Sequence, residues 1–313
     1  MSRSKRAAQT PPDTKTEGGL FTDGLGRWRT GWLLAVSLLA WLAASLLVRG
    51  GLSALFAALF RAWGIDETTA ARAPGWARLL YAWHGSLITA LFAAATLALS
   101  RLLRRLWKLP VGAPRVRVSA ARYWLLGTGM AALIAALCLL PDSLRPEWPL
   151  SAPRLSGALP ALWVLNLLSV FAEEAFVRRV VFDGLRDRWG GGWAAVCACA
   201  LFFAMNGGWA GNLWCALNVA LLAAACCLLY IKKGLWSVTM LRWGWSFANV
   251  FLLGFGGGDS AVYRLYSVSE GWLTGGDAGF ICGAWATLLL AALAAWLARE
   301  AMAALPRRLR RGQ

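Results

Sequence analysis

The sequence predicts an all-α fold, a polytopic membrane bundle of about eight transmembrane helices in one membrane domain. Hydrophobic residues make up 59% of the chain, and its mean hydropathy of +0.55 is too high for an ordinary soluble domain. Long apolar runs recur from Trp32 to Leu297 without a long polar interval. The net charge of +17 comes from basic residues spread over short loops, which indicates membrane orientation and argues against nucleic-acid binding.

The N-terminal part of the chain begins with a polar, basic stretch. Residues 1–31 predict a flexible cytoplasmic tail without a cleaved signal peptide. The first predicted span is 32–48, and the shorter run 52–63, which contains an arginine, predicts an interfacial helix that does not cross. The second span, 79–99, contains His84, the single histidine. We expect His84 to pack or hydrogen-bond between helices and not to catalyse.

Six further spans follow from the remaining apolar runs. They cover about 123–140, 160 to the basic residues near 186, 192–205, 213–231, 235–253 and 280–297. Of the 32 lysines and arginines, this topology puts 24 on the cytoplasmic side and 7 outside, with Arg242 inside the membrane. Such an asymmetry predicts that both termini are cytoplasmic.

These spans divide the chain into four parts. They are a flexible cytoplasmic N-terminal tail (1–31), N-terminal transmembrane helices (32–159), a membrane core (160–298) and a basic cytoplasmic tail (299–313). The seven cysteines all fall in or beside apolar runs and have no pattern of metal ligands or disulfides. We therefore expect no metal site and no cofactor.

Two adjacent carboxylates, Glu173 and Glu174, lie at the end of the fourth apolar run. On a helix, Glu174 and Arg178 are four residues apart and form an ion pair, whereas Glu173 points about 100° away. An ionisable group at a membrane boundary is costly and usually functional. The alternative is a water-exposed helix end that carries mixed charge.

The pattern Glu-Glu-x-x-x-Arg, formed by Glu173, Glu174 and Arg178, resembles the first motif of the CPBP family of intramembrane endopeptidases. This family, also known as the Abi family, includes the CAAX prenyl endopeptidase. The likeness extends over about 160–297, in the order and spacing of motifs. It implies a membrane core of packed helices with proteolysis inside the bilayer.

The second and third motifs of that family are altered in this chain. The second, Phe-x-x-x-His, lines up with Phe202 to Asn206, so that asparagine replaces histidine. In the third, a histidine precedes an asparagine by four residues, and Arg242 and Ser246 stand at these positions on one helix face. The resemblance therefore implies a degenerate active site.

The resemblance implies that Glu173 activates water, that the histidines position it and that the His/Asn pair stabilises the oxyanion. Asn206 can orient a water but cannot take its proton, and Arg242 can stabilise an oxyanion only if no glutamate already pairs with it. Unpaired Arg and Glu side chains are both expensive in a membrane. We therefore expect Arg242 to pair with Glu173 while Arg178 holds Glu174.

The expected function is that of a CPBP-like membrane protein with impaired catalysis, a pseudoenzyme that binds or chaperones hydrophobic or prenylated peptides or membrane proteins. One alternative is an active endopeptidase with Glu173 as general base. Another is a transporter or channel component, suggested by the intramembrane residues Arg242, Asn218 and His84, although no inverted repeat is found. The expected location is the bacterial inner (cytoplasmic) membrane, with the lipid bilayer as partner.

Overall fold

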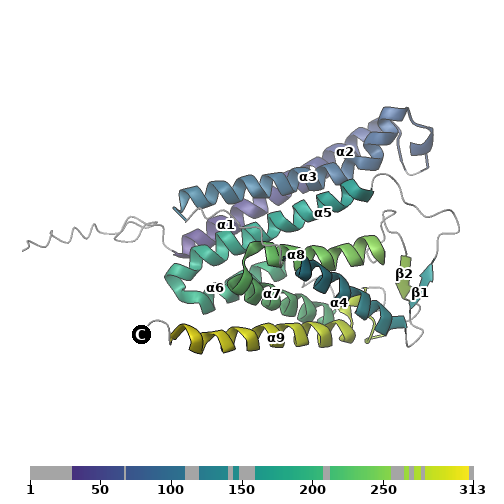
Figure 1. Cartoon of the computed structure of the whole chain (residues 1–313). Helices are drawn as coiled ribbons and strands as arrows, with labels where there is room; N and C mark the ends of the chain where they lie inside the picture. Colours follow the sequence, from purple (N-terminus) through teal and green to yellow (C-terminus); the bar gives the residue numbers. More distant parts are fainter. Residues whose placement is uncertain are drawn as a thin grey trace, which may run out of the picture.

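A computed structural model describes residues 30–66, 68–109, 120–139, 144–147, 159–206, 212–254, 264–267, 271–275 and 279–309. The described chain is a bundle of apolar helices, which confirms the all-α class (Figure 1). Nearly all of the predicted N-terminal tail lies outside these residues. The long helices are α1 (Thr30–Ala44), α2 (Leu52–Ala62), α3 (Gly75–Leu106), α4 (Ala121–Leu139), α5 (Leu159–Glu174), α6 (Asp183–Met205), α7 (Leu213–Lys233), α8 (Leu235–Ser246) and α9 (Ala284–Leu309).

Three π-helical segments join or extend these helices: η1 (Ser45–Gly51), η4 (Ala175–Phe182) and η5 (Phe247–Leu252). Two short 3-10 turns are η2 (Ala70–Arg72) and η7 (Phe280–Cys282). Figure 1 shows α1, α2 and α3 along one side of the bundle and α9 along the opposite side, with α4 to α8 between them.

Each of the eight predicted spans corresponds to a helix. By length and composition, five helical segments of the described chain can cross a membrane. The segment Leu159–Met205 contains the fourth and fifth predicted spans, which Gly190 separates with a non-helical backbone (φ 80°, ψ 165°). The seventh span is α8 with η5, and the eighth is α9, which continues to Leu309, beyond the predicted end.

The prediction of a separate interfacial or re-entrant helix at 52–63 is wrong. α2 continues α1 through η1, so that Thr30–Ala62 is one helix of 33 residues. The prediction rested on the short run and on Arg61, but the helix continues through Gly51, which has ordinary right-handed helical angles (φ −62°, ψ −48°). Glycine weakens a helix without breaking it, and no proline lies in this region.

The helix ends follow local sequence signals. α3 begins directly after Pro74, and α7 begins after Asn212, whose side-chain oxygen accepts a hydrogen bond from the Cys215 amide at 2.8 Å. α7 ends at Gly234, whose φ of 85° only glycine adopts readily. A tight turn of this kind lets α8 return immediately alongside α7.

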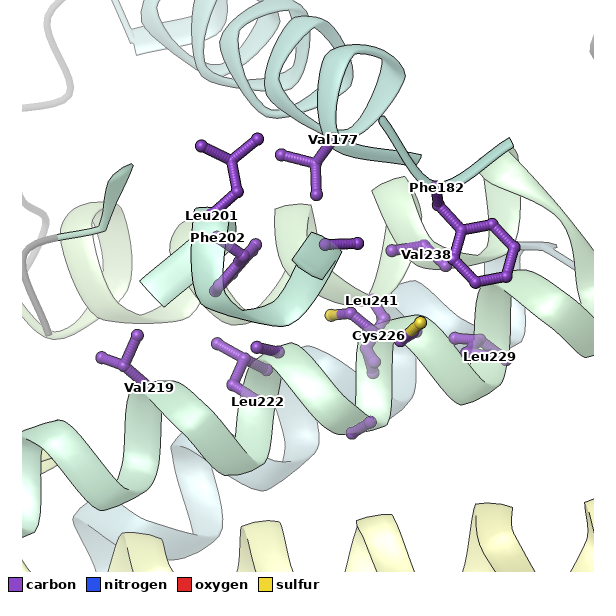
Figure 2. Close-up of a cluster of buried hydrophobic side chains, with 14 of the residues drawn as sticks. Val177, Phe182, Leu201, Phe202, Val219, Leu222, Cys226, Leu229, Val238 and Leu241 are labelled. Carbon is purple, nitrogen blue, oxygen red and sulfur yellow. The ribbon is translucent and has the colours of Figure 1, made fainter. Parts of the chain in front are cut away.

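The core of the membrane bundle is formed by η4, α6, α7 and α8. Figure 2 shows apolar side chains of these four elements gathered into one cluster, including Phe182, Phe202, Leu222 and Leu241. All four are buried. Close packing of this kind fixes the relative positions of the helices that carry the polar motif residues.

α4 and α8 pack at unusually short range through two glycines. A Cβ atom at Gly127 would overlap the carbonyl oxygen of Leu241, and one at Gly244 would overlap that of Trp124. Thr128 also donates a hydrogen bond to the Gly244 carbonyl at 3.2 Å. Small residues that let two backbones approach are typical of membrane helix pairs, and here they hold the helix that carries Arg242.

A small two-stranded ribbon lies at one end of the bundle (Figure 1). Its strands, β1 (Leu144–Glu147) and β2 (Arg264–Ser267), are antiparallel. The sequence did not predict them because each has only four residues. They link two connections that lie far apart along the chain.

Candidate functional site, a buried cluster of carboxylates and arginines

The ends of two helices and the middle of a third meet at the predicted motif residues. α5 ends in Glu173 and Glu174, and the wide turns of η4 follow immediately with Arg178. Asn206 follows the last residue of α6, and Arg242 lies on α8. The structure therefore brings five of the six predicted site residues together through tertiary packing.

Arg242 is the centre of this cluster. Its Nη1 donates hydrogen bonds to Glu173 Oε2 and Glu174 Oε1, each at 3.1 Å. Its Nη2 donates to Glu173 Oε2 at 3.1 Å and to Asn206 Oδ1 at 3.0 Å. The predicted pairing of Arg242 with Glu173 is confirmed, and Arg242 also pairs with Glu174, which had been assigned to Arg178 alone.

The pair predicted from helix spacing is also present. Arg178 Nε donates to Glu174 Oε2 at 3.0 Å, and both side chains are 0% exposed. Arg178 Nη2 donates to the carbonyl of Ala223 on α7 at 3.3 Å. Both oxygens of Glu174 are therefore engaged, each by a different arginine.

Aromatic and amide groups of α6 complete the contacts of Arg242. Asn206 Nδ2 donates to the Phe202 carbonyl at 3.0 Å, which turns its oxygen toward Arg242. The Arg242 guanidinium carbon also lies 4.6 Å from the centre of the Phe202 ring. A cation over an aromatic face is attracted by the ring. Phe202 and Asn206, four residues apart, therefore both contact Arg242.

Ser246 lies one helical turn from Arg242 and does not join the ion pairs. Its hydroxyl accepts a hydrogen bond from Asn166 Nδ2 on α5 at 3.0 Å. Asn166 was not identified from the sequence, although it lies seven residues before Glu173 and therefore on the same face of α5. That spacing was the signal that could have found it.

Arg49 is a second site residue that sequence reasoning missed. Its Nη2 lies 4.0 Å from Glu173 Oε1, and its guanidinium stacks 3.9 Å from the centre of the Phe92 ring. Its side chain is 46% exposed, whereas that of Glu173 is 20% exposed. The contact depends on how the N-terminal helices pack against α5, and no local pattern encodes that.

Each π-helical segment adjoins this cluster. Arg49 belongs to η1, Arg178 belongs to η4, and η5 begins directly after Ser246. A π-helical turn holds one more residue than an α turn and changes the direction of the following side chains. Such segments are frequent at functional sites, which supports assigning a function to this region.

The other intramembrane polar residues have local partners. His84 packs against Phe56 and Phe60 of α2, with ring centroids 5.8 and 5.2 Å apart, which confirms the expectation of a packed histidine. Its Nδ1 donates to the Tyr81 carbonyl at 2.6 Å within its own helix. Asn218 donates to the carbonyls of Ile281 and Gly283, and its oxygen accepts from Thr287 at 2.6 Å. These bonds fix the start of α9 against α7, so Asn218 has a structural role that needs no transported ion.

The chemistry open to the cluster is limited by its own contacts. All four terminal N–H groups of Arg242 are used, so only its Nε–H is left for a further acceptor. Three guanidiniums face two carboxylates, which leaves one excess positive charge near Glu173. Among the described residues, no group of three or more histidine, cysteine or acidic side chains could hold a metal ion.

Comparison with known families identifies the same region. Residues 155–248 match the family model described as Type II CAAX prenyl endopeptidase Rce1-like. The match confirms the resemblance drawn from the motifs and contains all six motif positions, although it covers less than half of the chain. Neither the curated proteins nor the solved structures gave a match. The chain is an integral membrane protein, and its residues 155–248 are similar to this family.

Proposed function

We propose that this membrane protein has an impaired protease site and binds or chaperones hydrophobic peptides or membrane proteins. The observation that carries the proposal is the double ion pair of Arg242, which donates to Glu173 and Glu174 at 3.1 Å. In the family's chemistry, a glutamate must accept a proton from water. Here Glu173 Oε2 already accepts two hydrogen bonds from a cation.

Two electrostatic arguments support loss of catalysis. Both terminal nitrogens of Arg242 donate to Glu173 Oε2, so a water molecule would have to compete with the guanidinium for that oxygen. The position that would stabilise the oxyanion is filled by Arg242, whose terminal donors are all engaged. A substrate carbonyl would have to displace a glutamate or Asn206 to receive one of them.

A binding role requires only the polar groups of the site and not a catalytic base. Three helices from separate parts of the chain still form a polar centre inside an apolar bundle, with Glu173 and Arg242 partly accessible at 20% and 10% exposure. An extended peptide with apolar side chains could reach these groups from within the bilayer. The family likeness suggests hydrophobic or prenylated peptides as the class to test.

Restoring the family's motif residues tests the loss of catalysis. The variant Asn206→His, Arg242→His, Ser246→Asn should gain cleavage of a quenched fluorescent prenylated peptide in proteoliposomes, while the unmodified protein should not cleave it. The matched control adds Glu173→Gln to the triple variant and should abolish the gain. Cleavage by the unmodified protein that is lost in Glu173→Gln would instead support the active endopeptidase.

The binding role is tested separately. A fluorescently labelled prenylated peptide should bind the unmodified protein in nanodiscs with a saturable rise in anisotropy, and unlabelled peptide should compete for the same sites. Equal signals from empty nanodiscs would rule out specific binding of this peptide. A transporter would be indicated only by solute flux into vesicles that depends on the protein.

A further inference from the structure

A second site lies on the N-terminal side of the bundle, in a cavity of about 950 Å³ between α2 and α3. One wall is a single face of the η1–α2 helix, from Arg49 through Ala57 to Arg61, and the opposite wall is α3 from Tyr81 to Thr89. At 1.5 Å per residue, Arg49 and Arg61 are about 18 Å apart along the helix. The cavity is therefore elongated and runs parallel to the helices.

The cavity is positively charged. Arg49 and Arg61 line it, and within the described part of the chain Arg61 forms no ion pair. Among the described residues, the acidic side chain that lines it is Asp66, which is held in its own turn by hydrogen bonds from Thr68 and Thr69 to Oδ1. These bonds, with that of the Thr68 side chain first, lower the pKa of Asp66 to about 2. Two arginines therefore face one carboxylate, and that carboxylate already accepts hydrogen bonds from Thr68 and Thr69.

The cavity has an arginine at each end, and its middle combines small and apolar side chains with the hydroxyls of Ser53 and Thr89. Arg61 and His84 face it near the end where α2 stops, and the His84 ring is fixed because Nδ1 donates to the Tyr81 carbonyl. Only Nε2 of that ring remains for a ligand. Between Arg61 and Arg49, the walls include Ala57 and the buried side chain of Ile88.

We propose that this cavity binds one anionic phospholipid of the surrounding bilayer, with its phosphate at Arg61 and a hydrocarbon chain along the wall toward Arg49. Arg61 is the second-last residue of α2 and follows Phe60, which packs on Tyr81 near the start of the second predicted span (79–99). That start is the predicted outer boundary of the membrane, where lipid phosphates lie. Basic pockets between transmembrane helices bind anionic lipid headgroups in this way. A soluble anion would use Arg61 but would leave the apolar length of the cavity without a partner.

This site is distinct from the carboxylate cluster but touches it at one residue. Arg49 ends the cavity and also lies 4.0 Å from Glu173. A lipid chain that fills the cavity would hold Arg49 on Phe92 and against Glu173. The bound lipid would therefore stabilise the ion-paired arrangement, whatever the function of the carboxylate cluster.

The proposal is tested on the purified full-length protein in detergent, by native mass spectrometry and by the thermal unfolding midpoint. Phosphatidylglycerol, phosphatidylcholine and inorganic phosphate are added separately as probes. We expect one phosphatidylglycerol per chain and a raised midpoint. The variant Arg61→Gln should weaken this binding about tenfold or more, since a charge-assisted hydrogen bond is lost.

Two further variants complete the test. Arg78→Gln removes an exposed arginine of α3 that does not line the cavity, and it should bind phosphatidylglycerol as the unmodified protein does. Ala57→Trp fills the cavity without changing its charge and should abolish lipid binding. If Ala57→Trp does not fold, the comparison of Arg61→Gln with Arg78→Gln by itself decides whether Arg61 binds the lipid phosphate.

Three results would overturn the lipid site. Equal binding by Arg61→Gln and Arg78→Gln would exclude the proposed phosphate position. Equal affinity for phosphatidylcholine and phosphatidylglycerol would exclude selection for negative charge. An equal rise of the midpoint with inorganic phosphate alone would mean that the cavity takes a soluble anion and not a lipid.

Discussion

Arg242 compensates two carboxylates at once, and Glu173 has no other contact of the same quality to replace it. Glu173 would keep only the 4.0 Å contact with Arg49, and Glu174 would keep Arg178. Removing one partner of a buried ion pair is far more damaging than replacing the whole pair by apolar groups. The effect of changing Arg242 should therefore depend on whether Glu173 is changed with it.

The first prediction follows from this dependence. Arg242→Leu should lower the free energy of unfolding by about 3–5 kcal/mol, the range measured when a buried pair loses one partner. Combining it with Glu173→Leu should recover part of the loss, because the uncompensated carboxylate is gone. Unfolding in detergent gives the four values of this double-mutant cycle, and losses that simply add would contradict the direct ion pair.

The second prediction concerns metal. Both motif histidines are replaced, by Asn206 and Arg242, and His84 lies on another helix, where it bonds to its own backbone. A catalytic zinc needs three protein ligands, usually with histidine among them. We expect no stoichiometric zinc by elemental analysis of the purified protein. About one zinc per chain that disappears in Glu173→Ala would contradict this expectation.

At the level of helices, the position of Arg242 depends on the contact between α4 and α8. Gly127 and Gly244 lie at this crossing, and a side chain at either would meet the backbone of the other helix. Backbone atoms cannot move aside as a flexible side chain can. The two helices would therefore separate, and Arg242 would move away from the carboxylates of α5.

This crossing gives the third prediction and its control on the same helix. Gly127→Ala should lower the free energy of unfolding by about 1–3 kcal/mol through overpacking. Gly129→Ala, two residues further along α4, meets nothing within 4 Å. It should leave stability unchanged or raise it by up to about 1 kcal/mol, because alanine is the better helix former. Equal effects of the two substitutions would argue against the close crossing.

Sequence reasoning reached those parts of the site that rest on helix spacing or on the energy of burial. The four-residue spacing was enough to predict the ion pair between Arg178 and Glu174. The high energy of a lone guanidinium in a membrane was enough to predict the ion pair between Arg242 and Glu173. Arg49 could not be found, because its contact depends on how two distant helices pack. The same limit explains why the ion pair between Arg242 and Glu174 was missed.

The fold was predictable to a similar extent. Apolar runs located every long helix, since burial in a membrane requires them. The continuity of α1 with α2 was missed because the run 52–63 is short and contains Arg61, features that favour an interfacial helix. The β1–β2 ribbon pairs residues about 120 apart in sequence, a non-local pairing that four residues per strand cannot specify.

For the whole molecule, the distribution of basic residues predicts the orientation. Twenty-four of 32 lysines and arginines fall on the side assigned to the cytoplasm. Reporter fusions after Lys233 and after Arg311 should therefore both give a cytoplasmic signal, with alkaline phosphatase inactive and a cytoplasmic fluorescent protein active. An external signal at either position would overturn the eight-span topology.

The continuous helix of 33 residues has a consequence for the choice of bilayer. At 1.5 Å per residue it is about 50 Å long, and α3 with 32 residues is nearly as long, whereas α4 with 19 residues measures about 29 Å. The hydrocarbon layer is about 30 Å thick, so α4 matches it while the two N-terminal helices must tilt or project. Hydrophobic mismatch therefore falls almost entirely on α1 to α3. In thicker bilayers these helices could stand more upright, whereas α4 would have to thin the membrane around it.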